Sequence, residues 1–346
     1  MNSESPNPPC PSMPSEAIMT TQTPIQSPAE EGELLPDMDK TASASSLPTE
    51  KSRKVMSPAY RAVTIDKVVE FTNLYDLWDK ETWWVAENIV MPETMAGPVI
   101  DGTPCAPAKR YYELFPPTEV GKVDIFISHT WGNKWGLLVA SAIHFIDCLV
   151  SGDQEFHATM GAGLHHISKK FSKMSRSRSI RVWIDIFAVM QHATDGKAVD
   201  VNSLGEVVDA SVVTLMVLDK EKAIPLTRVW CLYEMIKTAE SFEEKKTEDV
   251  PLENRKGSVE LKPNHVFHTR IGSSERDLFH PATPEEIKNV FHHVNVEEAQ
   301  AKYEEDRIFV LDLAAKVQTK KYGKGYTAIN KMAKQALANV LSYAES

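Results

Sequence analysis

Three short, mainly apolar runs stand out in the middle of the chain: Val123–Ser128, Ile180–Ile186 and Val212–Leu218. Runs of this length, apolar at nearly every position, are typical of strands buried on both faces of a parallel sheet. An amphipathic stretch with helical spacing follows each run, at Leu137–Val150, Val199–Ala210 and Arg228–Glu240. This alternation predicts right-handed βαβ units, and therefore an α/β fold with a central parallel sheet flanked by helices.

Further elements are expected on both sides of this core. Apolar and aromatic residues recur at roughly helical spacing between Tyr60 and Asn88, which predicts one or two helices. After the core, strands are expected at Val259–Leu261 and Val266–Thr269, and helices at Pro284–His292, Val296–Val317 and Thr327–Tyr343. The chain is thus divided into a tail at 1–56, an N-terminal helical and irregular extension at 57–120, the α/β domain at 121–275 and a helical C-terminal extension at 276–346.

The tail at 1–56 differs in composition from the rest of the chain. It is rich in Ser, Thr, Pro and Glu, and no aromatic residue precedes Tyr60. Such a segment buries too little apolar surface to offset the entropy lost on ordering, so we predict that it is disordered.

Composition narrows the class of protein. The 346 residues include 48 Asp and Glu against 38 Lys and Arg, which argues against nucleic acid as the main partner. The four cysteines form no CxxC pair, as expected in a reducing compartment. No apolar segment approaches the roughly 18 residues that cross a bilayer. Because the histidines and cysteines fall in no recognised ligand spacing, no metal site is expected. We therefore predict a cytoplasmic protein without a membrane span.

The residues that most strongly indicate a functional site lie at the junction between the third apolar run and the helix expected after it. Thr227 occupies the expected N-cap position, and Trp230 and Glu234 are four residues apart, so they share one helix face near its N-terminus. In an open α/β sheet, this junction forms the rim of the ligand crevice. Two interpretations remain open: a functional carboxylate beside an indole, or a core tryptophan followed by a solvated glutamate.

Several stretches resemble a known family. VDIFISHTW is similar to the first strand and following loop of TIR domains, and RVWIDI resembles their second strand. The stretch VVTLMVLDKEKAIPLTRVWCLYEM resembles the fourth strand and the Trp-Cys-Leu-x-Glu helix start of plant-type TIR domains. The motifs SHTWG and WCLYE are most similar to a divergent TIR-like group of algal and other protist proteins. The resemblance covers roughly Val123–Glu240 and implies a TIR or flavodoxin-like sheet.

The resemblance also implies a chemistry. In catalytic TIR domains a helix glutamate is essential for cleavage of NAD⁺ at the nicotinamide glycosidic bond, and that residue corresponds to Glu234. The substrate-binding residues implied are Trp230 and, at the ends of the first two strands or in the loops that follow them, Ser128, His129, Trp131, Asp185 and His192. NAD⁺ would be a substrate, with no cofactor required. Many TIR domains act instead as non-catalytic modules that associate with themselves or with TIR-like partners, and this alternative stays open.

Overall fold

The computed structural model describes residues 56–97, 99–100, 103–104, 107–151, 179–192, 200, 203–221, 224–247, 266–275, 278–292, 294–301, 304–319 and 322–345. Contacts divide the chain into Met1–Arg53 and Lys54–Ser346, and every described residue belongs to the second unit. The tail predicted at 1–56, apart from Met56, and the strand expected at Val259–Leu261 lie outside the described residues.

Seven of the described strands form one sheet in the order β4-β1-β6-β5-β7-β8-β9. Their bounds are β1 Ala62–Thr64, β4 Val120–Gly121, β5 Ile125–Ser128, β6 Arg181–Trp183, β7 Val213–Asp219, β8 Val266–Glu275 and β9 Leu278–Pro281. The four central strands are parallel, as predicted. The sheet as a whole is mixed, because β1, β4 and β9 pair antiparallel at its two edges. The prediction of a parallel sheet therefore holds for the centre and is wrong for the edges.

Antiparallel pairing at the edges has a local cause. β9 follows β8 after a connection too short for a crossover helix, so the chain can only turn back on itself. β1 and β4 come from the segment before the α/β core, and β1 lies between β4 and β6. β7, which the family resemblance equates with a fourth strand, is the third parallel strand that the structure describes.

Successive residues of the central strands point to opposite faces and build two hydrophobic cores. Phe126 of β5 packs with Trp183 and Met216 on one face. Its neighbours Ile125 and Ile127 pack into the other. This is the alternation expected of strands buried on both faces, and it explains why their apolar runs have almost no polar interruptions.

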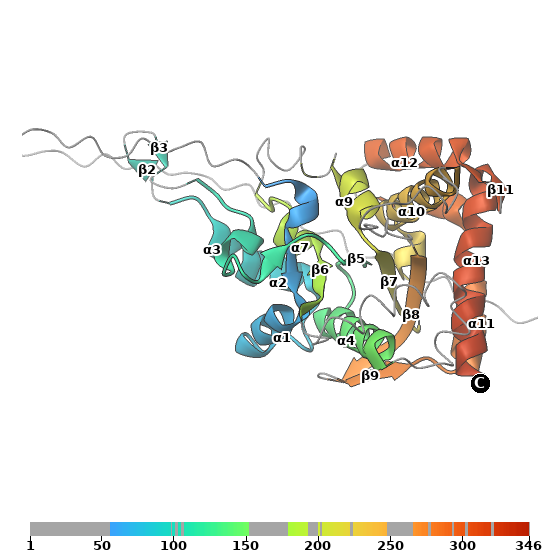
Figure 1. Ribbon diagram of the computed structural model, residues 1–346, viewed down its shortest axis with the longest axis horizontal. Helices are drawn as coiled ribbons and strands as arrows, with labels where there is room; N and C mark the ends of the chain where they lie inside the picture. The colour runs from blue at the N-terminus through green and yellow to red at the C-terminus, as the bar shows by residue number, and fades with distance from the viewer. Residues whose placement is uncertain are drawn as a thin grey trace, which may run out of the picture. The chain divides into compact units, whose positions relative to one another are not determined.

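Helices cover both faces of the sheet. They are α1 Ile65–Leu74, α2 Thr82–Val85, α3 Met91–Thr94, α4 Trp135–Ser151, α7 Asp185–Ala188, α9 Leu204–Ala210, α10 Val229–Thr247, α11 Pro284–Phe291, α12 Glu304–Lys316 and α13 Gly325–Ala344. Figure 1 shows α9, α10, α12 and α13 on one side of β7 and β8, and α1 with α4 on the other. None of the described helices is long and apolar enough to cross a membrane.

Shorter elements complete the described part of the chain. They are the 3₁₀ turns η1 Pro58–Tyr60, η3 Tyr111–Leu114, η5 Ile224–Thr227 and η7 Val296–Glu298, the π-helical turn η2 Ala86–Val90, and the strand pairs β2 Val99–Ile100 with β3 Thr103–Pro104 and β10 Gln318–Thr319 with β11 Gly323–Lys324. The single helix predicted at Val296–Val317 is therefore two separate elements, η7 and α12.

The start of α10 also differs from its prediction. Thr227 ends η5 and the helix begins at Val229, so Thr227 is not the N-cap. The reason is a tertiary contact: the backbone N–H of Gln300 donates to the Thr227 carbonyl at 2.7 Å, and the N–H of Val229 donates to the Gln300 carbonyl at 3.1 Å. A distant segment thus takes the place of a side-chain cap.

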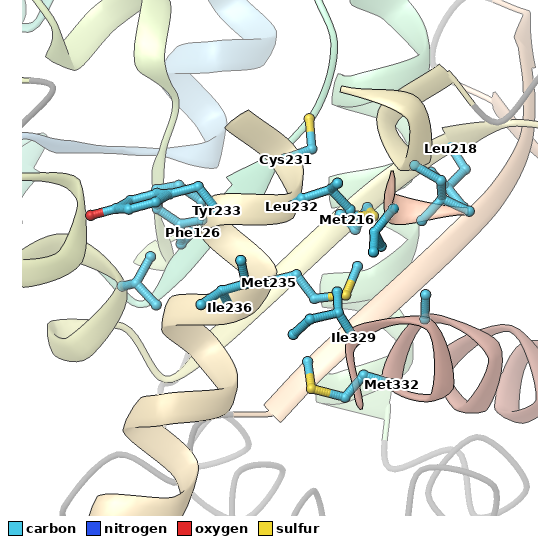
Figure 2. Close-up of a cluster of buried hydrophobic side chains, with 14 of the residues drawn as sticks. Phe126, Met216, Leu218, Cys231, Leu232, Tyr233, Met235, Ile236, Ile329 and Met332 are labelled. Atoms are coloured by element: carbon cyan, nitrogen blue, oxygen red, sulfur yellow. The ribbon is translucent and has the colours of Figure 1, made fainter. Parts of the chain in front are cut away.

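Packing along α10 fixes its first turns over the ends of the central strands. Figure 2 shows Leu232, Met235 and Ile236 of α10 in the cluster that contains Met216 of β7 and Ile329 of α13. Each of these side chains is essentially buried. Full burial of one such side chain contributes about 1.5–3 kcal/mol, so the helix is held firmly in this orientation.

Candidate functional site

Polar side chains meet at the carboxyl ends of β5 and β6 and the first turns of α10. Ser128 is the last residue of β5, and Asp185 begins α7 two residues after the end of β6. Glu234 lies on α10, the helix that follows β7. Because β6 and β7 lie on opposite sides of β5, the strand order reverses there. Ligands of open α/β sheets bind at this kind of switch point.

Glu234 is the most perturbed carboxyl group of the site. Its Oε2 atom is buried and has no hydrogen-bond partner among the described residues, although the residue as a whole keeps some exposed surface. Burial raises the pKa of Glu234 from 4.5 to about 8, and the negative charge of Asp185 adds to the shift, whereas Ser128 opposes it. The interpretation of Glu234 as a solvated helix residue is therefore not what the geometry favours.

Ser128 and Cys231 lie beside this carboxyl group. Ser128 is fully buried, and its hydroxyl makes no hydrogen bond of ordinary geometry to a described residue, yet it lies close enough to lower the pKa of both Glu234 and Cys231. The Cys231 thiol donates to the carbonyl of His129 at 3.2 Å. Burial, with a contribution from Glu234, raises the pKa of Cys231 well above its ordinary value, so it stays a thiol. Sequence reasoning missed Cys231 as a site residue, although WCLYE contains it.

Asp185 connects the two loops of the site. Its Oδ2 accepts a hydrogen bond from the Trp131 indole N–H at 2.8 Å, and its Oδ1 accepts one from the backbone of Ile186 at 2.7 Å. His129 Nε2 lies 3.6 Å from the same Oδ1. The carboxylate is therefore anchored on its own loop and presented to the loop after β5.

His129 is enclosed by these groups. Its side chain is 4% exposed, and Nε2 is buried without a hydrogen-bond partner among the described residues. Burial lowers the pKa of His129, an effect that Asp185 and the Ile127 backbone oppose. The imidazole is therefore neutral at pH 7.

Two of the residues predicted for the site face other segments. The Trp230 indole N–H donates to Asp306 of α12 at 3.2 Å, and its ring packs edge-on against Tyr233. His192 hydrogen-bonds to Thr94 of α3 at 3.0 Å. The structure thus brings together Ser128, His129, Trp131, Asp185 and Glu234, while Trp230 and His192 tie the surrounding elements to one another.

A buried ion cluster holds the loop after β6. Asp200 is 1% exposed and accepts from Arg61 at 2.6 Å, from Arg110 at 2.7 Å and from the backbone of Met190 at 2.9 Å. Sequence reasoning missed this cluster. Its partners lie 139 and 90 residues from Asp200 along the chain, and no local pattern signals such a pairing.

The described residues contain no group of three or more His, Cys, Asp or Glu side chains arranged to hold a metal ion. In comparisons with known proteins, no family model, curated protein or solved structure matches the chain.

Proposed function

We propose that this chain is a TIR-like signalling protein that hydrolyses NAD⁺ at the nicotinamide glycosidic bond, with Glu234 as the catalytic carboxylate. The observation that carries the proposal is the buried, unpartnered Oε2 of Glu234 at the ends of the central strands. The order of the parallel strands, β6-β5-β7-β8, supports the fold assignment because flavodoxin-like sheets place the second strand before the first.

The charge of the substrate suits this environment. With a pKa of about 8, Glu234 is mostly protonated at pH 7 in the free protein. The nicotinamide ring of NAD⁺ carries a positive charge, and a cation close to a buried carboxyl lowers its pKa. Substrate binding would thus ionise Glu234 next to the ribosyl carbon. The carboxylate then stabilises the oxocarbenium-like transition state.

Of the two indoles predicted to bind substrate, Trp131 is better placed. Its N–H donates to Asp185, whose charge acts on Glu234, whereas the N–H of Trp230 is bonded to Asp306. We assign substrate contact to Trp131 and the positioning of α10 to Trp230.

The test is nicotinamide release by purified protein and by Glu234→Gln. The substitution is nearly isosteric and removes only the negative charge, so we expect turnover to fall about 10²–10³-fold with substrate affinity retained. Glu285→Gln, an exposed position on α11, is the matched control and should leave turnover unchanged. Wild-type protein that releases no nicotinamide, even at high concentration, would refute the proposal.

A second candidate function is a non-catalytic self-association module. The observation that favours it is the exposure of Ile308 and Phe309 on α12, which are 61% and 52% exposed. If this function holds, sedimentation should show concentration-dependent association, and Ile308→Ser with Phe309→Ser should abolish it. Association without nicotinamide release would favour the module over the enzyme.

A further inference from the structure

Three buried polar atoms of the site lack hydrogen-bond partners among the described residues: Ser128 Oγ, His129 Nε2 and Glu234 Oε2. Leaving one such atom unpaired costs about 1–3 kcal/mol, and folded proteins keep few of them. Here they come from adjacent residues of one strand end and from the helix packed against it. The unpaired hydrogen-bonding capacity is therefore concentrated where the proposed chemistry takes place.

We infer that His129 is the general base of the proposed hydrolysis: its Nε2 accepts a proton from the water molecule that attacks the ribosyl carbon, and the nearby Asp185 carboxylate stabilises the imidazolium that forms. The inference rests on the proposed function and goes beyond it, because the resemblance assigned His129 to substrate binding only.

The contacts of His129 fit this role. Asp185 Oδ1 lies 3.6 Å from Nε2 and can stabilise the imidazolium that forms, while Trp131 and the Ile186 backbone hold the carboxylate. The Cys231 thiol holds the His129 carbonyl at 3.2 Å and so fixes the residue against α10. The ring is neutral at pH 7, so its unprotonated nitrogen is available to accept a proton.

The water oxygen forms a bond to the ribosyl carbon, and the bond from that carbon to the nicotinamide nitrogen breaks. Its electron pair neutralises the pyridinium ring, which leaves as neutral nicotinamide. The proton lost by the water passes to His129 Nε2 and then to solvent. Glu234 stabilises the cationic carbon whichever nucleophile attacks, whereas His129 is needed only when the nucleophile must lose a proton.

This division of roles defines the experiment. A substituted pyridine attacks the same carbon through its ring nitrogen and has no proton to lose, so exchange of nicotinamide for the pyridine needs no base. Hydrolysis and exchange are measured in one mixture of NAD⁺ and the pyridine. For His129→Gln we expect hydrolysis to fall about 10²–10⁴-fold while exchange continues at the wild-type rate. Glu234→Gln should lose both reactions, and His280→Gln, an exposed position on β9, should lose neither.

Each other outcome has a definite meaning. Equal loss of hydrolysis and exchange in His129→Gln would overturn the inference, because it would show a role in substrate binding or in the fold. Unchanged hydrolysis would overturn it as well, because the base would lie elsewhere. If His129→Gln does not fold, Asp185→Asn serves instead, and lowered hydrolysis with retained exchange is again the expected result. Wild-type protein that catalyses neither reaction would refute the proposed function itself, which distinguishes that failure from a failure of the base assignment.

Discussion

Burial of Glu234 controls the charge state of the site, and under the proposed function it predicts an activity that depends on pH. The pKa of Glu234 in the free protein is about 8, and the proposed chemistry uses the ionised form. Since kcat/KM reports the ionisation of the free enzyme, we expect it to rise tenfold per pH unit below pH 8 and to level off above it. Initial rates of nicotinamide release between pH 6 and 9.5 provide the measurement. A profile that is flat across pH 8 would contradict this assignment.

The same group predicts how stability changes with pH. The folded pKa of about 8 lies above the ordinary 4.5, so between these values the folded protein binds more protons than the unfolded chain. Stability contributed by this group is therefore fully present below pH 4.5 and is lost as pH rises towards 8. Glu234→Gln removes the titration. We expect the free energy of unfolding of the variant at pH 8 to exceed that of wild type by about a few kcal/mol. A pKa shift of this size implies a difference of that order.

Urea unfolding of wild type, Glu234→Gln and Glu285→Gln at pH 5 and pH 8 tests this expectation. Glu285→Gln replaces an exposed residue and retains Glu234, so its stability should fall from pH 5 to pH 8 by as much as that of wild type, whereas Glu234→Gln should lose this dependence. If Glu234 were solvated, its replacement would have as little effect as that of Glu285. Equal urea midpoints for all three proteins at each pH would therefore support the interpretation of Glu234 as a solvated helix residue. The measurement does not depend on NAD⁺ or on any activity.

Among single residues, the sequence indicated those whose position follows from strand and helix ends. Ser128 ends β5, as predicted, whereas Asp185 was expected within the second strand and instead begins α7, two residues after β6 ends. Trp230 shared a helix face with Glu234 in sequence, but its partner Asp306 belongs to a segment 76 residues away. Spacing along a helix predicts which residues share a face; it does not predict what packs against that face.

At the scale of elements, α4 depends on a close approach to the chain before α2. A Cβ atom on Gly136, the second residue of α4, would lie 2.2 Å from the carbonyl oxygen of Trp78. Because that neighbour is backbone, it cannot move aside without shifting the segment. We expect Gly136→Ala to destabilise the protein by about 1–3 kcal/mol and to displace the loop that carries His129 and Trp131.

Gly205→Ala is the matched control for this prediction. Gly205 lies in α9, and the nearest atoms to an added Cβ are 3.8 Å away, which is ordinary contact. Alanine should therefore raise stability by about 0.4–1 kcal/mol through the entropy of the unfolded chain. Thermal unfolding of both variants gives the comparison, and a Gly136→Ala variant as stable as Gly205→Ala would contradict the close approach.

Elements with long apolar runs were predictable, and those made by distant pairing were not. β5, β6 and β7 are buried on both faces, so their sequences show it directly. β1 and β4 have three and two residues, which is too short for any periodic signal. They are strands only because each finds a partner edge far along the chain.

At the scale of the whole molecule, the segment before Lys122 is part of the main sheet and of its core. β1 covers the edge of β6, and the indole N–H of Trp183 in β6 donates to the Pro58 carbonyl at 3.0 Å. Phe71 of α1 lies in ring contact with Phe187 of α7, with centroids 5.0 Å apart. The segment predicted as an extension at 57–120 thus packs against β6 and against α7, the helix that Asp185 begins.

This integration gives a prediction about truncation. A fragment of residues 54–346 should unfold within a few degrees of the full chain, because it retains every described contact. A fragment of residues 122–346 should show no cooperative transition. It would lose β1, leaving β6 as an unpaired edge, and it would leave Asp200 buried without Arg61 and Arg110. Removing the partners of a buried charge alone costs about 3–5 kcal/mol, a large part of the stability of a domain.

Calorimetry and circular dichroism on the two fragments measure the outcome. The variant Asp200→Asn in the 54–346 fragment separates the two causes, since it disturbs the ion cluster and leaves β1 in place. We expect this variant to fold with a lowered Tm, because Arg61 is 2% exposed and loses its charged partner. A 122–346 fragment that melts cooperatively near the temperature of the full chain would show that the α/β domain is independent of the segment before it.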